Sequence, residues 1–148
     1  MSAREEKARG YFAKSYNCAQ SVFGAFSEDW GIDSAMALRL ASGLGGGLRH
    51  GEVCGAVSGA TLAIGLKCGL YIEGDLAQKM YCNQKTIEFI EKFKEANGTI
   101  LCRELLGADI HHPDDLNTPE IKAQTKIECP EFIAAAVRIL EDMEFDGK

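Results

Sequence analysis

The chain has 148 residues, of which 46% are apolar and 26% are charged, a composition typical of an ordinary globular domain. Its formal net charge is −6 and its basic residues do not cluster, so we expect no nucleic-acid partner. The N-terminal stretch MSAREEKARGYFAKS lacks the apolar run of a secretory signal, which predicts a cytoplasmic protein, and no segment is apolar enough to predict a membrane contact.

The apolar pattern is helical along nearly the whole chain, and no segment alternates with period two for long enough to predict a strand. The predicted helices span residues 3–14, 17–30, 33 to the glycine run that begins at 43, about 52–70, 75–97, 119–129 and 130–144, with a short helical turn at 102–107. We therefore predict an all-α protein, one domain over residues 1–148, built as a bundle of about six to eight helices with a glycine-rich loop before the central helix.

Helix boundaries are marked by residues that cap helices. Asn17 is suited to begin the second helix, Asp33 or Ser34 the third and Asp75 the fifth. Gly98 is suited to end the fifth helix. A further helix is expected to begin at Thr118, because Pro119 then occupies the first helical position.

Eight glycines lie between residues 43 and 65, in GLGGGLRHGEVCGAVSGATLAIG. Gly51, Gly55 and Gly59 are four residues apart, so on one helix they would form a row that admits a second backbone or leaves room for a bulky group beside Cys54. The loop before them resembles an anion-binding loop in its free N–H groups. It lacks the GK[ST] ending of a P-loop and the spacing of a dinucleotide motif, so a nucleotide is not expected.

The six cysteines include no CxxC pair, so any site must be assembled from distant parts of the chain. Cys54 falls in the first turn of the predicted central helix, Cys102 opens the short turn, and Cys129 is placed to cap the last helix. Helix N-termini stabilise thiolates, and Arg49 and His50 would add positive charge. We therefore expect a lowered pKa for Cys54 first and for Cys129 next.

The remaining candidates are weaker. Cys18, Cys68 and Cys82 fall inside predicted helices, where Cys68 and Cys82 are typical of core positions. The loop DIHHPDD, residues 109–115, has side chains that could bind a divalent metal, but two adjacent histidines in a polar loop are more typical of a solvated turn.

Several motifs together resemble one family. CGAVSG at 54–59 is preceded by GGG and followed by AIGLKCG, and YNCAQSVFGAF, GTILCRELLGADI and CPEFIAAAV continue the similarity. The pattern resembles the C_GCAxxG_C_C family, which is regarded as redox-active and shares four cysteines. Matched motif by motif, these are Cys18, Cys54, Cys102 and Cys129. Some members carry a twin-arginine export signal, which implies a prosthetic group such as an iron–sulfur cluster.

The resemblance implies a redox-active site in which the four cysteines converge. They would serve as metal ligands for an iron–sulfur cluster, or cycle between dithiol and disulfide without any cofactor, in electron transfer. In this hypothesis Cys54 and Cys129 are the catalytic thiols, and Gly55 and Gly59 leave room for a cofactor. Two alternatives stay open, a structural zinc site with the same four ligands and a non-redox helical module that binds a small anion.

The expected partner is a redox protein, either an oxidoreductase or a transporter-associated protein. Assembly of the chain into a homo-oligomer also stays open.

Overall fold

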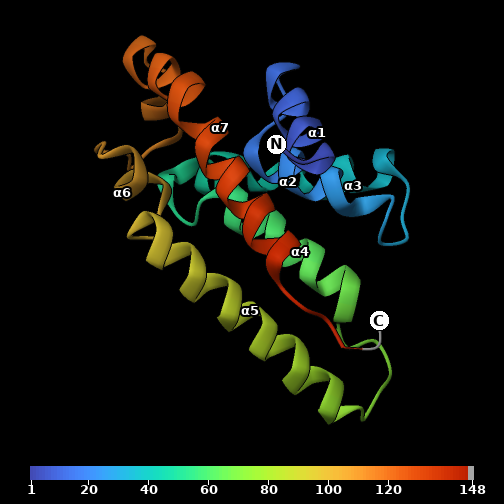
Figure 1. Cartoon of the computed structure of the whole chain (residues 1–148). Coiled ribbons are helices and arrows are strands. Elements are labelled where there is room, and N and C mark those ends of the chain that lie inside the picture. Colours follow the sequence, from blue (N-terminus) through green and yellow to red (C-terminus); the bar gives the residue numbers. More distant parts are fainter. Residues whose placement is uncertain (147–148) are drawn as a thin grey trace.

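The structure is a computed structural model that describes residues 1–146, and within that range it holds seven α-helices and no β-strand (Figure 1). The predicted all-α bundle is therefore confirmed. The helices are α1 (Ala3–Ala13), α2 (Cys18–Ser27), α3 (Ser34–Ala41), α4 (Gly55–Cys68), α5 (Leu76–Asn97), α6 (Cys102–Leu106) and α7 (Pro119–Asp142). Short helical turns lie between them at η1 (Ser42–Leu44), η2 (Gly47–Gly51) and η3 (Pro113–Asn117).

The capping residues set the helix ends as the sequence predicts. The Asn17 side chain accepts the N–H of Gln20 at 2.9 Å, and the Gln20 side chain accepts the N–H of Asn17 at 2.9 Å, which closes a capping box at the start of α2. Asp33, Asp75 and Thr118 cap α3, α5 and α7 through their side chains. Gly98 ends α5 in the left-handed conformation.

The C-terminal part of the prediction is wrong in one respect. Residues 119–129 and 130–144 do not form two helices, because α7 is continuous through Pro130. A proline inside a helix has no N–H to donate to the carbonyl four residues earlier, here that of Lys126, and the rest of the helix is retained by packing. Cys129 consequently lies in the middle of α7 and does not cap a helix.

The start of the central helix also differs from the prediction. The helix α4 begins at Gly55, so Cys54 is its N-cap residue and Gly51 lies in the preceding loop with φ 68°. The row of three glycines is therefore reduced to Gly55 and Gly59. Cys18 lies inside α2, as predicted, and is its first residue. Three cysteines do lie at helix starts, but the third is Cys18 in place of Cys129.

The core forms around α4, which packs against α2, α5 and α7; in Figure 1, α7 passes in front of α4 and α5 runs beside them. Large side chains from these helices are completely or almost completely buried there: Val22, Phe26, Val57, Ile64, Phe89, Phe93, Ile133 and Leu140. Within residues 1–146, no helix has the length and apolar character needed to cross a membrane.

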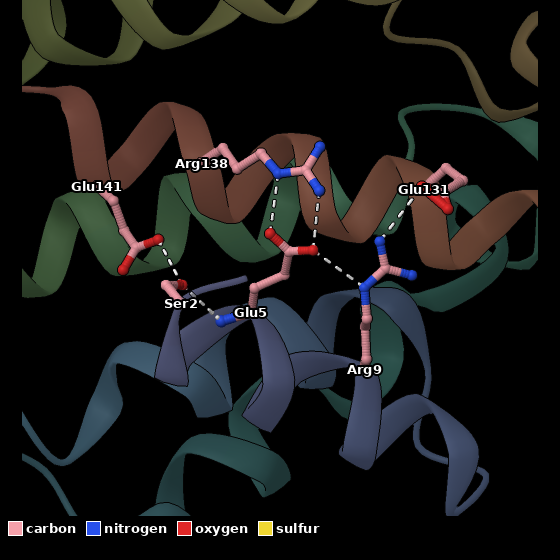
Figure 2. Close-up of polar contacts among 6 residues, drawn as sticks. All are labelled: Ser2, Glu5, Arg9, Glu131, Arg138 and Glu141. Carbon is pink, nitrogen blue, oxygen red and sulfur yellow. Dashed lines mark hydrogen bonds and ion pairs between the residues drawn. The ribbon is translucent and has the colours of Figure 1, made fainter.

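An ion pair around the buried Glu5 side chain joins α1 to α7. The Glu5 side chain is only 2% exposed and accepts hydrogen bonds from Arg138 Nε at 2.8 Å and Arg138 Nη2 at 2.9 Å, and from Arg9 Nε at 3.1 Å (Figure 2). At one end of the same interface, Ser2 Oγ donates to Glu141 at 2.7 Å. These contacts fix α1 on α7, and with it the segment that leads into Cys18.

Candidate functional site

The four cysteines of the motif pattern line one cavity of about 280 Å³. Cys18, Cys54 and Cys102 come from the starts of α2, α4 and α6, and Cys129 comes from the middle of α7. Cys54 is 5% exposed and Cys129 is 8% exposed, whereas the other two are half-buried. Residues that lie 111 positions apart in the sequence, 18 and 129, are thus brought to one cavity.

The other two cysteines lie elsewhere. Cys68 is buried at the C-terminal end of α4, where its thiol donates to the carbonyl of Ile64 at 3.3 Å. Cys82 is half-buried on α5 and packs against the main core. All six side chains are present as thiols.

A short backbone pairing brings Cys54 and Cys102 together. The N–H of Cys54 donates to the carbonyl of Ile100 at 2.7 Å, and the N–H of Cys102 donates to the carbonyl of Glu52 at 2.6 Å. The two segments run antiparallel, with Val53 opposite Leu101. Each cysteine therefore leaves this pairing at the point where its own helix begins.

The glycine-rich loop forms a left-handed turn beside the cavity. Gly46, Gly47, Leu48 and Arg49 have φ values of 62°, 61°, 59° and 60°. The left-handed conformation is unfavourable for residues that carry a Cβ, so Leu48 and Arg49 are strained. Gly47 is required for a second reason, because a Cβ there would lie 2.5 Å from the Glu52 nitrogen and 2.9 Å from Cys102 Cβ.

The two predicted cofactor-binding glycines have different surroundings. Gly55 lines the cavity, and a Cβ on it would lie 3.1 Å from the Cβ of Cys18. Gly59, one helical turn further along α4, lies against the backbone of Ala19 instead. Of the two, only Gly55 is placed to leave space beside the cysteines.

Cys18 and Cys129 each shift the pKa of the other. A hydrogen bond from the Cys18 thiol is the main cause that lowers the pKa of Cys129, against the opposing effect of burial. The same bond, together with burial, raises the pKa of Cys18 well above its usual range. The pair therefore holds its proton on Cys18 and favours the thiolate on Cys129.

The pKa values of Cys54 and Cys102 are raised, whereas that of Cys129 is lowered. Burial raises the pKa of Cys54 to about 12, although the N–H groups of Ala56 and Val57 at the start of α4 act against it. Burial likewise raises the pKa of Cys102 to about 11, opposed by Arg49 and Arg103. The lowered pKa predicted for Cys54 is therefore wrong, because desolvation outweighs the helix N-terminus. The lowered pKa predicted for Cys129 has the right direction but a different cause.

The charged groups of the cavity are cationic. Arg49 and Lys122 line it and are exposed, so they stand at its mouth, and no aspartate or glutamate is among the described residues that line it. Leu105, Leu106 and Phe132 form much of the inner wall. The sequence gives no sign of Lys122, because the approach of α7 to the glycine-rich loop depends on the tertiary fold.

The ligand geometry of a single metal ion is not formed. A tetrahedral zinc site needs all four sulfurs about 2.3 Å from one point. Within residues 1–146, no group of three or more His, Cys, Asp or Glu side chains is placed to hold a metal ion. In the loop at 109–115 both histidines are exposed, and the Asp115 carboxylate accepts the N–H groups of His111 and His112 at 2.9 and 3.0 Å.

Comparison with known proteins supports the motif-based resemblance. The model of the family described as "Putative redox-active protein (C_GCAxxG_C_C)" matches residues 16–143, a range that includes all six cysteines. Comparisons with curated proteins and with solved structures found no match. Since the family model covers nearly the whole chain, the protein belongs to the C_GCAxxG_C_C family.

Proposed function

We propose that this protein is a thiol redox protein in which Cys18 and Cys129 cycle between dithiol and disulfide. The observation that carries the proposal is that both side chains line one cavity together with two further cysteines. The pKa of Cys129 is lowered, which favours the nucleophilic thiolate, and Cys18 lines the same cavity as a second thiol. The family description, a redox-active protein, is consistent with this chemistry.

The substrate would be a disulfide, which the protein would reduce by thiol–disulfide exchange. The Cys129 thiolate attacks one sulfur of the substrate disulfide, which releases the first substrate thiolate and forms a mixed disulfide. Cys18 then loses its proton to solvent and attacks the Cys129 sulfur, which releases the second substrate thiolate. Each released thiolate takes up one proton. Two electrons pass from the protein to the substrate, and the protein keeps a Cys18–Cys129 disulfide.

A second candidate function is iron–sulfur cluster binding, and a different observation favours it. Four thiols line one cavity together with Arg49 and Lys122 and without a carboxylate, which is a donor set suited to thiolate-held iron. Cys18, Cys54, Cys102 and Cys129 would hold the cluster, and the two cations would offset its negative charge. A bound cluster would supply one-electron transfer. In a cluster the four thiolates would be divided among two or more irons, so the sulfurs need not meet around a single point.

The experiment that separates the two candidates starts with protein purified without oxygen. Iron and sulfide analysis with a visible spectrum tests for the cluster. The metal-free, reduced protein is then oxidised with diamide and digested, and the disulfide-linked peptides are identified by mass. We expect a Cys18–Cys129 link in the wild-type protein and in a Cys68→Ser/Cys82→Ser control, and its loss in Cys129→Ser. Stoichiometric iron and sulfide, with no Cys18–Cys129 link after oxidation, would replace the first proposal with the second.

A further inference from the structure

We propose that the cavity selects anionic substrates, and that the disulfide reduced by Cys129 and Cys18 is a small molecule that carries carboxylates near its sulfur atoms. This inference rests on the proposed thiol–disulfide function and adds the substrate class. It assigns to Arg49 and Lys122 the role of binding the substrate anion at the mouth of the cavity.

The charge around the cavity differs from that of the rest of the chain. The chain has 22 acidic and 16 basic residues, so its surface is mostly unfavourable for anions. The cavity is different, because Arg49 and Lys122 line it without any described aspartate or glutamate. Arg4, Arg9, Arg103 and Arg138 form ion pairs with carboxylates, whereas among residues 1–146 Arg39, Arg49 and Lys122 form none. Their charges are thus available to a ligand.

The backbone at Arg49 is strained. Its φ of 60° is a conformation that an arginine rarely adopts, and Leu48 before it has φ 59°. Glycine or asparagine would fit either position with less strain. Strained residues of this kind concentrate at functional sites, where the surrounding structure holds them in place. Here the strained turn carries a guanidinium group to the mouth of the cavity.

The size and lining of the cavity limit the ligand. A volume of about 280 Å³ lies just below the range of about 300–1,000 Å³ for sites that hold drug-sized molecules. The inner wall is formed by apolar side chains and cysteines, and the cations stand outside them. The arrangement fits a compact molecule whose disulfide enters the cavity while its carboxylates stay at the mouth.

The test uses three small disulfides of similar length and different charge, namely the dianion 3,3′-dithiodipropionate, neutral bis(2-hydroxyethyl) disulfide and the dication cystamine. Rates of Cys18–Cys129 disulfide formation are measured in the reduced protein and divided by the rates of the same reagents with mercaptoethanol. We expect the dianion to be favoured over the neutral reagent by about tenfold at low salt, and the preference to fall as salt is added.

Two pairs of variants separate charge from structure. Arg49→Asn removes the charge from a position whose backbone asparagine tolerates, and Leu48→Asn relieves the same kind of strain without changing charge. Lys122→Gln removes the second cation, and Lys126→Gln removes an exposed charge one turn further along α7 that does not line the cavity. We expect Arg49→Asn and Lys122→Gln each to lower the preference severalfold, and Leu48→Asn and Lys126→Gln to retain it.

A second probe keeps the two proposals distinguishable. Alkylation of Cys129 by iodoacetate, an anion, is compared with alkylation by neutral iodoacetamide, which requires no disulfide chemistry. If iodoacetate is favoured through Arg49 and Lys122 but no Cys18–Cys129 disulfide forms, the anion preference of the cavity stands and the thiol–disulfide function and its substrate are wrong. If the disulfide forms but neither probe prefers the anion over its neutral counterpart, this inference is overturned and the proposed function stands.

Discussion

Gly59 of α4 lies directly against the backbone of Ala19 in α2. A Cβ at Gly59 would be 2.5 Å from the Ala19 carbonyl oxygen and 2.9 Å from its Cα, so no side chain fits there without movement of the backbone. This contact sets the distance between the two helices that begin next to Cys18 and Cys54. The close packing of α2 on α4 therefore also positions the two cysteines at one side of the cavity.

Replacement of Gly59 tests that contact. We expect Gly59→Ala to lower the free energy of unfolding by about 1–3 kcal/mol, because the added methyl group forces α2 and α4 apart. Gly65→Ala is the matched control in the same helix, since a Cβ there meets nothing within 4 Å. Alanine is the better helix former, so this control should gain up to about 1 kcal/mol. Urea unfolding measures both, and equal changes in the two variants would contradict the close contact.

The helices could be predicted from the sequence because their ends depend on local chemistry. Asn17, Asp33, Asp75 and Thr118 cap the helices they were predicted to cap, and each does so through a bond to a residue three positions later. Pro130 is the exception. Proline is common at the first turn of a helix, so the sequence favoured a new helix there, whereas tertiary packing carries α7 through it.

The cavity could be predicted only in outline. The motifs point to four cysteines, but their convergence depends on the pairing of residues 52–54 with 100–102 and on the packing of α7, which are long-range contacts. The meeting of Cys18 and Cys129 in one cavity has no local signal at all. Cys54 shows the limit of the helix-terminus argument, because burial, which the sequence does not give, decides the direction of its pKa shift.

The ion pair between α1 and α7 gives the second prediction. Glu5→Gln removes the charge that pairs with Arg138 and Arg9 in a position where the side chain is only 2% exposed. We expect the free energy of unfolding to fall by about 1–3 kcal/mol at pH 7. Glu6→Gln is the control, because Glu6 is an exposed residue of the same helix. Thermal or urea unfolding checks the difference.

The stability difference between wild type and Glu5→Gln should depend on pH. The pKa of Glu5 in the folded protein is lowered, mainly by its hydrogen bonds with Arg138, so its contribution is complete above the unfolded pKa near 4.5. It is lost as the pH falls through the lower, folded pKa. The difference in stability between wild type and Glu5→Gln should therefore be constant from pH 6 to 8 and shrink below about pH 4.5. A difference that grows as the pH falls would contradict the assignment.

The left-handed turn gives the third prediction. Leu48 has φ 59° and a side chain that is 50% exposed, so glycine relieves backbone strain there at little cost in packing. We expect Leu48→Gly to stabilise the protein by up to about 1 kcal/mol. Leu40 is also exposed but lies within α3, so Leu40→Gly should destabilise by about 1 kcal/mol. Stability changes of opposite sign in the two variants, measured by thermal unfolding, would support backbone strain at Leu48. A loss of stability in both variants would contradict it.

The fourth prediction concerns the control of Cys129 by Cys18. The hydrogen bond from Cys18 lowers the pKa of Cys129 against burial and the charge of Glu128, so replacing Cys18 with alanine should raise that pKa above the usual value near 9. The rate of Cys129 alkylation by iodoacetamide, followed by peptide mass from pH 6 to 10, gives the pKa as the midpoint of its rise. We expect this midpoint to move to higher pH in Cys18→Ala, and to move less in Cys18→Ser, whose hydroxyl can still donate.

The midpoint is the decisive quantity, because the smaller alanine side chain also opens the cavity and changes the rate at every pH. Cys54→Ala provides the matched control, since Cys54 lines the same cavity but does not contribute to the shift at Cys129. That variant should keep the wild-type midpoint. Cys54 itself, with a pKa of about 12, should be alkylated slowly throughout the range. An unchanged midpoint in Cys18→Ala would show that Cys18 does not stabilise the Cys129 thiolate. Early labelling of Cys54 would contradict the raised pKa of that thiol.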